Sequence, residues 1–323
     1  MDSETTSIPA ADSQFPALKT VAARGTTRGH VLSELKELYR YRELLWTFVV
    51  RELRIRYKNS VLGFFWSILN PLITVLVMTV VFKYVLNVRV PNYSAYLLAA
   101  YLPFMFFQLA LLDSAQSILT QLPLLKKIYF PREILPIGSV IANFLHFLLA
   151  MGVFFLYLLF VWWMNPGENP FRATVFWLPL LVLLQFCLTL GLALFISALN
   201  TFYEDVKYLV SVGLYLLFFL CPILYFVEQV WAATHSPDIP AQWQDTLFTI
   251  YNLNPIGMLL VGYRKLMLDP QPITVTRTGD VLETHYLPLD WTMLAIAGAV
   301  SVLVMVAGYA YFNKVKWRFV ERP

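Results

Sequence analysis

The chain has 323 residues, of which 59% are hydrophobic and only 14% are charged, and its formal net charge is +4 at pH 7. Soluble domains carry roughly 25% charged residues, so this composition excludes an ordinary water-soluble fold. The basic residues gather at the ends of long apolar runs, which marks them as determinants of membrane topology and argues against a nucleic-acid-binding surface.

The N-terminal 62 residues fall into two parts. Residues 1–30 are rich in Ser, Thr, Ala and Pro and lack the apolar region and cleavage site of a signal peptide, so we predict a disordered cytoplasmic tail. In residues 31–62, apolar side chains such as Leu38 and Leu45 recur at helical spacing among arginines. This pattern predicts an amphipathic interface helix on the inner membrane surface. A soluble helix packed on another domain is the alternative.

The rest of the chain contains six apolar runs of about 20 residues or more, each long enough to cross a hydrocarbon core of about 30 Å as a helix. We therefore predict an all-α integral membrane protein whose residues 63–323 form six transmembrane helices. The predicted spans are 64–88, 96–120, 136–164, 174–198, 208–227 and 289–312.

The positions of Lys and Arg predict the orientation of these spans. Basic residues are frequent before the first span, between the second and third, before the fifth and after the sixth, whereas the opposite short loops offer only Arg89 and Arg172. By the positive-inside rule both termini are cytoplasmic. The loop at 165–173 and the segment 232–245 then lie outside the cytoplasmic membrane.

The longest predicted outward loop, from about 228 to 288, contains an apolar stretch from Ile256 to Leu268. Asn254 and Pro255 precede it, and Asn at the cap with Pro at the first helical position is typical of a helix start. The stretch is too short to span a bilayer. We predict short re-entrant or interfacial helices that dip into the outer leaflet before the last span; a surface helix resting on lipid is the alternative.

Residues suited to catalysis are rare within the spans. Asp113, with Gln116 and Ser117 nearby, is more typical of a helix that faces a partner or a cavity than of an acid catalyst. His146 has no second ligand at helical spacing, so we predict no metal site. No phosphate-binding loop occurs, and if ATP drives this protein, another chain must bind it.

Three parts of the chain carry recognisable motifs. They are RELRIRYKNSVLGFFWSILNPL at 51–72, YFPREILP at 129–136, and the pair FYEDVKYL at 202–209 and NPIGMLLVGYRKL at 254–266. Together they resemble the permease subunits of bacterial ABC exporters for O-antigen, capsule and teichoic acid polymers. The resemblance covers about residues 35–320 and leaves the role of residues 1–30 open.

The resemblance implies a homodimer in the bacterial cytoplasmic (inner) membrane, joined by two copies of an ABC ATPase subunit that bind ATP and magnesium. It implies a lipid-linked glycan as substrate. This chain is then a multi-pass transport subunit and not an enzyme, with no catalytic residue, metal or cofactor of its own and no nucleic-acid partner.

The basic cluster before the first span is the first candidate site. Arg51, Arg54, Arg56 and Lys58 lie at the predicted inner leaflet, where anionic headgroups attract basic side chains. The same cluster could hold the pyrophosphate of a lipid-linked substrate. Membrane anchoring is the alternative, and the two roles are compatible.

The motif YFPREILP predicts a second site between the second and third spans. Pro131 and Pro136 bracket a segment that cannot continue the flanking helices, so it should protrude as a separate element. In the family that the chain resembles, this loop is the coupling helix that docks into the ATPase; an ordinary polar loop is the alternative. The resemblance implies that Tyr129, Phe130, Arg132 and Glu133 form that interface.

Aromatic residues make up 16% of the chain, and many lie near the outer ends of the predicted spans. Most would form the interfacial belt of a membrane protein. Others could line a sugar pathway, because aromatic faces pack against pyranose rings while polar edges form hydrogen bonds. The resemblance implies aromatic rings along a channel, and the candidates are Tyr101, Phe104 and Tyr225.

The primary hypothesis is therefore the membrane subunit of an ATP-driven polysaccharide exporter. One alternative is a permease of the same architecture for a drug or a small lipid. Another is a membrane-integral glycosyltransferase or acyltransferase, which would need a carboxylate pair or a His-Asp set near one face. The sequence does not distinguish O-antigen, capsule and teichoic acid as the polymer.

Overall fold

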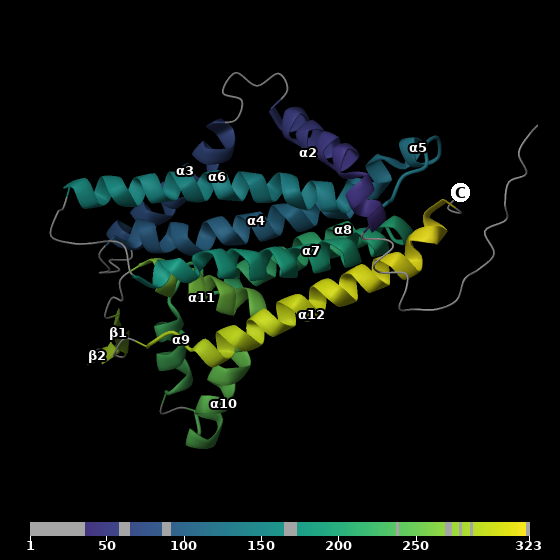
Figure 1. Ribbon diagram of the computed structural model, residues 1–323. Helices are drawn as coiled ribbons and strands as arrows, with labels where there is room; N and C mark the ends of the chain where they lie inside the picture. Colours follow the sequence, from purple (N-terminus) through teal and green to yellow (C-terminus); the bar gives the residue numbers. More distant parts are fainter. Residues whose placement is uncertain are drawn as a thin grey trace, which may run out of the picture.

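The computed structural model is a helical bundle (Figure 1). At one end, called the α5 end, lie the short helix α5 (Leu122–Leu125) and the turn η3 (Lys316–Val320), and at the other, called the hairpin end, lies a two-stranded hairpin. The structure describes residues 36–57, 65–85, 92–164, 173–236, 239–268, 273–277, 280–284 and 287–320. The predicted tail at 1–30 and most of the predicted loop at 165–173 lie outside these residues.

Four helices in the described part of the chain are long and apolar enough to cross a membrane by length and composition. They correspond to the predicted spans at 96–120, 136–164, 174–198 and 289–312, so these predictions are confirmed as helices. The four are α4 (Tyr93–Thr120), α6 (Ile134–Met164), α7 (Leu178–Phe202) with the 3-10 turn η2 (Ala173–Trp177), and α12 (Trp291–Val315) with the 3-10 turn η3 (Lys316–Val320).

The other two predicted spans differ in outcome. Within the span predicted at 64–88, the described residues 65–85 form α3 (Phe65–Thr79) and the π-helical turn η1 (Val80–Val85). The span predicted at 208–227 is α8 (Val206–Leu220), whose 15 residues reach only about 22 Å. Its predicted C-terminal end is wrong because Pro222 lacks a backbone N–H and disfavours a helical Cys221. The count of six spans stays a prediction.

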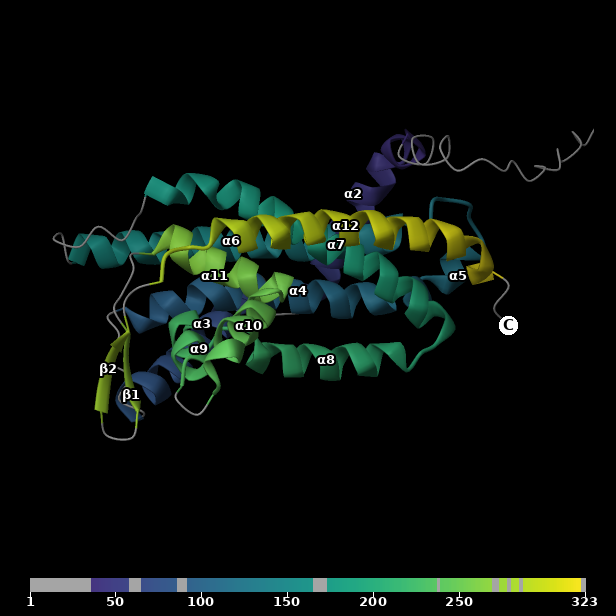
Figure 2. The ribbon, with the colours of Figure 1, turned by 90° about the horizontal axis from the view of Figure 1, so that it is seen from below.

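Helix α4 is the centre of the bundle. It packs against α3, α6, α7, α8 and α11, and 78% of its apolar window is buried inside the chain, compared with 22% for α6 and 28% for α12. Figure 2 shows α8 running beside α4. The exposed sides of α6 and α12 are therefore among the surfaces that the described residues leave for lipid or another subunit.

Helices α7 and α12 cross at direct backbone contact. A Cβ atom on Gly191 of α7 would lie 2.5 Å from the Cα atom of Met305, and one on Gly308 of α12 would lie 3.0 Å from the Cα atom of Gly191. Small residues allow such close approach between helices in membranes. Neither position has room for a side chain.

The segment between α8 and α12 contains helices and an unpredicted hairpin. The hairpin pairs β1 (Ile273–Arg277) with β2 (Asp280–Thr284) in antiparallel register. In the described part of the chain, the predicted all-helical fold therefore holds except for this hairpin. The helices are α9 (Val227–Thr234), α10 (Ala241–Asn252) and α11 (Pro255–Met267).

Helix α11 begins where the sequence predicted. The side chain of Asn254 accepts a hydrogen bond from the backbone N–H of Gly257, and Pro255 is the first helical residue. Almost every side chain of α11 is buried against α4, α7 and α12. This burial excludes the alternative of a surface helix resting on lipid.

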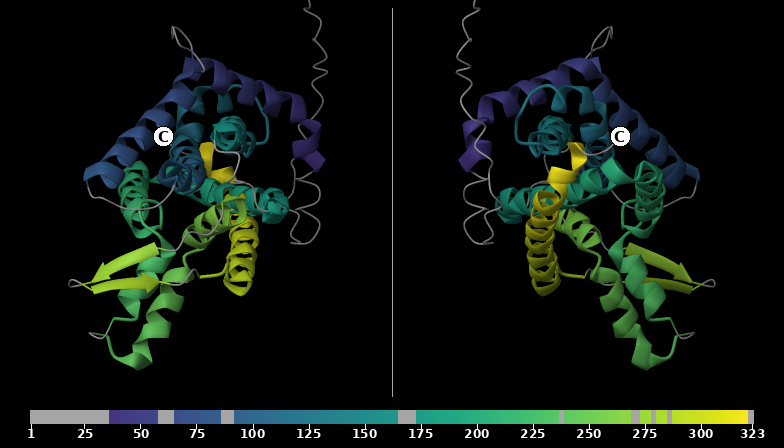
Figure 3. Two further views of the ribbon diagram at one scale, coloured as in Figure 1. Left: turned by 90° about the vertical axis from the view of Figure 1, so that its left-hand side faces the viewer. Right: turned by 90° about the vertical axis from the view of Figure 1, so that its right-hand side faces the viewer.

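Helix α2 (Arg42–Tyr57) lies across α6, on the opposite side of the bundle from α9, α10 and the hairpin (Figures 1 and 3). Phe48 and Val49 are buried against the bundle, whereas Trp46 and Ile55 are exposed. Residues 36–40 are also helical. The remainder of the predicted helix at 31–62 lies outside the described residues, and its place on a membrane surface stays a prediction.

Candidate functional site

The connection between α4 and α6 lies at the α5 end. It contains α5 and then residues 126–133, which are not helical. We predicted that Pro131 and Pro136 bracket a separate element, but only Pro131 lies outside the helices. Pro136 is the third residue of α6, and it is tolerated there because the first four N–H groups of a helix have no intrahelical partner.

Two side chains of this connection bind the C-terminal turn η3. The ammonium group of Lys316 lies 2.6 Å from a carboxylate oxygen of Glu133, and both residues are buried. The guanidinium of Arg132 donates a hydrogen bond to the backbone carbonyl of Lys316 and lies 5.8 Å from the ring centroid of Trp317. Burial lowers the pKa of Arg132, and the neighbouring Tyr129 and Glu133 oppose that shift.

The four residues predicted to contact an ATPase therefore have different surroundings. Phe130 is buried, with its ring centroid 5.8 Å from that of Phe48 in α2, and Glu133 is buried in its ion pair. Arg132 is partly buried, while Tyr129 is 69% exposed. Only Tyr129 is fully available to a partner. It continues an exposed surface, called the Lys126–Tyr129 surface, formed by Lys126, Lys127, Ile128 and Tyr129.

Two members of the predicted basic cluster line a groove between α2 and α6. Arg51 is partly exposed and Arg54 is exposed. The groove has a volume of about 1370 Å³. The side chain of Arg56 and all of Lys58 lie outside the described residues. The structure therefore brings Arg51 and Arg54 to one site and leaves the roles of Arg56 and Lys58 as predictions.

The three predicted channel residues do not converge on one surface. Tyr101 and Phe104 are buried in α4, with ring centroids 6.3 and 5.6 Å from that of Phe218 in α8. Tyr225 lies in the turn after α8, where its hydroxyl forms hydrogen bonds with the hydroxyl of Tyr251 at 3.1 Å and the carbonyl of Leu220 at 2.9 Å. All three rings are engaged within the chain.

Exposed aromatic residues lie instead along α8. Tyr208, Tyr215 and Phe219 are 62%, 63% and 50% exposed, and their spacings of seven and four residues place them on one side of the helix. Nothing lies within 4 Å of a Cβ built on Gly213 of the same helix. The helical spacing of this stripe is visible in the sequence, but none of its residues is among the predicted site residues.

Arg264 of α11 is a further polar anchor that the sequence analysis missed. It is only 6% exposed. Its guanidinium donates hydrogen bonds to the backbone carbonyls of Tyr96 at 3.0 Å, of Tyr225 at 2.7 Å and of Ile223. Buried carbonyls freed by a break such as Pro222 need partners. Arg264 supplies them and ties α11 to α4 and to the turn after α8.

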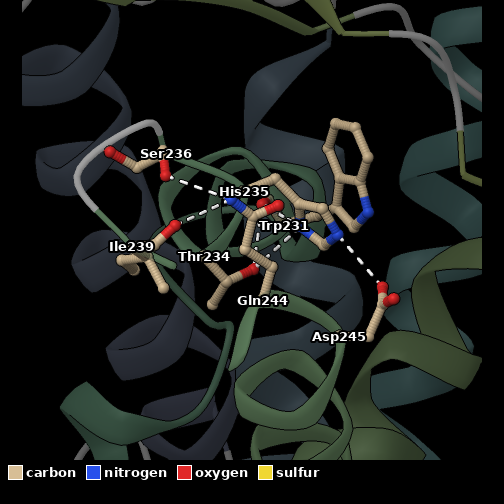
Figure 4. A network of polar contacts seen from close by, with 7 residues as sticks. All are labelled: Trp231, Thr234, His235, Ser236, Ile239, Gln244 and Asp245. Atoms are coloured by element: carbon tan, nitrogen blue, oxygen red, sulfur yellow. Dashed lines mark hydrogen bonds and ion pairs between the residues drawn. The ribbon is translucent and has the colours of Figure 1, made fainter. Parts of the chain in front are cut away.

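Helices α9 and α10 are joined by the polar network in Figure 4. A ring nitrogen of His235, Nε2, lies 3.2 Å from a carboxylate oxygen of Asp245, and the ring stacks on Trp231 at 4.4 Å. The other nitrogen, Nδ1, lies 2.9 Å from the carbonyl of Trp231. A carbonyl only accepts hydrogen bonds, so Nδ1 carries a proton and cannot activate the nearby hydroxyl of Thr234 as a base.

Helices α4 and α6 are linked by a polar contact. A carboxylate oxygen of Asp113 in α4 accepts a hydrogen bond of 2.8 Å from the amide of Asn143 in α6. The predicted partner-facing side of α4 is thus partly satisfied within the chain. Among the described residues, no group of three His, Cys, Asp or Glu side chains is arranged to hold a metal ion.

Comparison with known proteins gives a family and several relatives. The family described as ABC-2 type transporter matches residues 43–268. An O-antigen export system permease protein RfbA of Klebsiella pneumoniae is 31% identical over 279 residues, which cover 86% of this chain and 94% of the relative. The protein of the same description from Myxococcus xanthus is 31% identical over 287 residues, covering 89% and 98%. The polysialic acid transport protein KpsM of Escherichia coli is 28% identical over 202 residues, covering 60% and 70%.

Proposed function

Because this chain belongs to the ABC-2 type transporter family, we propose that it is the permease subunit of a bacterial exporter that moves a lipid-linked polysaccharide across the cytoplasmic membrane. The observation that carries this proposal is the similarity to O-antigen export permeases from two organisms over 94% and 98% of their own lengths. A match over the whole of a relative supports a common task more strongly than a match to one motif.

A separate ABC ATPase supplies the energy and contacts this chain at the α5 end. The sequence has no phosphate-binding loop of its own. The Lys126–Tyr129 surface supports the location, because it exposes the large side chains of Ile128 and Tyr129, and aromatic residues such as Tyr are enriched at protein interfaces. The basic residues of this end also favour a cytoplasmic position.

Two copies of the chain form the transport path between them. The exposed stripe of Tyr208, Tyr215 and Phe219 on α8 supports this arrangement, because tyrosine hydroxyls that face hydrocarbon lack hydrogen-bond partners, whereas a polar path supplies them. Aromatic faces pack against the apolar faces of sugar rings. We therefore place the glycan against α8. The stripe on this helix takes the place of Tyr101, Phe104 and Tyr225 as the candidate lining of the path.

A membrane-integral transferase is the alternative from another functional class. It needs a carboxylate pair or a His-Asp set beside a nucleophile. In the described part of the chain, the buried carboxylates of Glu133 and Glu228 are ion-paired with Lys316 and Lys265. His235 and Asp245 do form a pair, but Nδ1 of His235 is already donating. These contacts favour transport over group transfer.

The proposal is tested in cells that lack the gene and its ATPase partner. Restoring both chains should return polysaccharide to the cell surface, whereas restoring either chain alone should leave the polymer inside the cell. A hydrolysis-deficient ATPase should behave like no ATPase. Normal surface polymer in the absence of this chain would refute the proposal. Altered drug resistance with normal surface polymer would favour the small-molecule alternative.

A further inference from the structure

The groove between α2 and α6 has two chemically different parts. Its α2 wall carries the guanidinium groups of Arg51 and Arg54, which are three residues apart and so lie on the same face of the helix. Its α6 wall consists of Leu145, Leu148 and Leu149. Leu148 and Leu149 are 42% and 50% exposed. Cationic groups thus lie beside an apolar surface that remains exposed among the described residues.

The charge balance of the groove indicates what it binds. No acidic side chain is among the described residues that line it, so the two guanidinium groups have no carboxylate partner within the groove. Guanidinium groups bind phosphate oxygens with paired, charge-assisted hydrogen bonds. A soluble phosphate would make no contact with the leucine wall, and a purely apolar chain would form no ionic contact with either arginine. An amphiphile with a phosphate at one end satisfies both parts.

We propose that this groove binds a lipid through a phosphate-containing headgroup on Arg51 and Arg54, with its hydrocarbon tail along Leu145, Leu148 and Leu149. This inference rests on the proposed function and deepens it, because it identifies where the lipid end of the cargo is held before transport. Trp46 lines the same groove, and its large ring adds apolar contact area for the tail.

A photoactivatable lipid tests this site directly. The probe is a polyprenyl diphosphate with a diazirine in its tail, added to the complex of this chain with its ATPase in lipid nanodiscs. We expect labelled peptides from both walls of the groove, at residues 46–55 and 145–149. Excess unlabelled polyprenyl diphosphate should abolish labelling. Two other competitors, polyprenol, which lacks phosphate, and inorganic pyrophosphate, which lacks a tail, should each leave most of the labelling intact.

Matched variants separate the headgroup from the tail. The pair Arg51→Gln and Arg54→Gln should weaken probe binding about 25-fold, at about fivefold for each guanidinium removed. Arg42→Gln removes the same charge from an exposed position of α2 outside the groove and should change binding less than about twofold. Leu148→Trp should block the tail, while Leu156→Trp changes an exposed residue of α6 outside the groove and should not.

The outcomes distinguish the site from the function. Labelling that polyprenol suppresses equally, or that survives loss of both arginines, would show ordinary annular lipid only and would overturn the proposal. The same conclusion follows if labels fall outside residues 46–55 and 145–149. If the wild-type complex still exports polymer in that case, the proposed function stands without this site. Specific labelling in a complex that exports no polymer would support the lipid site and refute the proposed function.

Discussion

Lys316 and Glu133 are 183 residues apart in the sequence, yet their side chains form a buried ion pair of 2.6 Å. The pair joins the start of α6 to the end of α12 at the α5 end. The second carboxylate oxygen of Glu133 has no hydrogen-bond partner within the described residues. Lys316 is therefore the main compensation for this buried charge.

Replacing Lys316 by Met should destabilise the protein by about 3–5 kcal/mol, because removal of one partner leaves the other charge buried and unpaired. The measurement is thermal or denaturant unfolding of the purified chain in detergent. Lys314→Met is the control, since Lys314 is exposed two residues earlier. Adding Glu133→Gln to Lys316→Met should restore part of the loss. Equal stability of the Lys314 and Lys316 variants would contradict the importance of the pair.

Tyr129→Ala should weaken association with the ATPase without unfolding this chain. The side chain is 69% exposed, so little internal packing is lost, whereas an interface Tyr at the centre of a contact contributes about 2 kcal/mol or more. Co-purification of the ATPase and the midpoint of thermal unfolding are measured together. Tyr84→Ala, at a 72% exposed position of η1, is the control. Unchanged co-purification would move the interface elsewhere.

Gly308→Ala should separate α7 from α12 and lower stability by about 1–3 kcal/mol or more, the usual result of overpacking. A Cβ there would lie 3.0 Å from the Cα atom of Gly191, which is backbone and cannot rotate away. Gly213→Ala is the matched control, because nothing lies within 4 Å of its Cβ position. Thermal unfolding of the two variants is measured in parallel. Identical unfolding midpoints would show that α7 and α12 can move apart at little cost in stability.

Arg264→Met should loosen the turn after α8, because the backbone carbonyls of Ile223 and Tyr225 lose their buried donor. Hydrogen bonds from charged groups contribute about 1.5–3 kcal/mol each. Hydrogen exchange of the amides in residues 221–226 should become faster, while exchange in the middle of α7 should stay slow. Arg264→Lys should behave similarly, since one ammonium group cannot reach the same carbonyls as the planar fork. Unaltered exchange in the turn would assign Arg264 another role.

Single cysteines test the predicted orientation. Ala233 in α9 is exposed, and a cysteine there should react with an impermeant thiol reagent in intact spheroplasts if the hairpin end faces outwards. A cysteine at Lys126 should react only after the cells are opened. Each is made in a chain whose Cys187 and Cys221 are replaced by Ser or Ala. Labelling of Lys126→Cys in intact cells would show that the α5 end faces outwards. An ATPase in the cytoplasm could then not contact that end.

The sequence was sufficient for features that depend on local composition. Long apolar runs predicted α4, α6, α7 and α12, and the Asn254-Pro255 pair predicted the start of α11. The end of α8 was missed because Cys221 and Pro222 lie within a run whose average hydropathy stays high. A window average does not register one residue that breaks the backbone pattern.

The candidate site was only partly predictable because its contacts are long-range. The sequence predicts Glu133 as a contact for the ATPase, whereas the structure shows it buried in an ion pair with Lys316. Exchanging the charges of Arg132 and Glu133 would therefore disturb folding as well as coupling, and Tyr129 is the cleaner test. The groove likewise depends on α2 meeting α6 across about 100 residues of sequence, which no motif in either helix specifies.

The Glu133–Lys316 pair also has a consequence for how the protein is made. Ribosomes add about 5–20 residues per second, so Glu133 leaves the ribosome roughly 10 to 40 s before the lysine that lies 183 residues later. Throughout that interval the carboxylate at the start of α6 lacks the lysine that pairs with it in the folded bundle. A chain that stops at Val315 would keep α4, α6, α7 and α12 and still lack this contact. The turn η3 thus gives the cell a chemical difference between chains that have passed residue 316 and chains that have not.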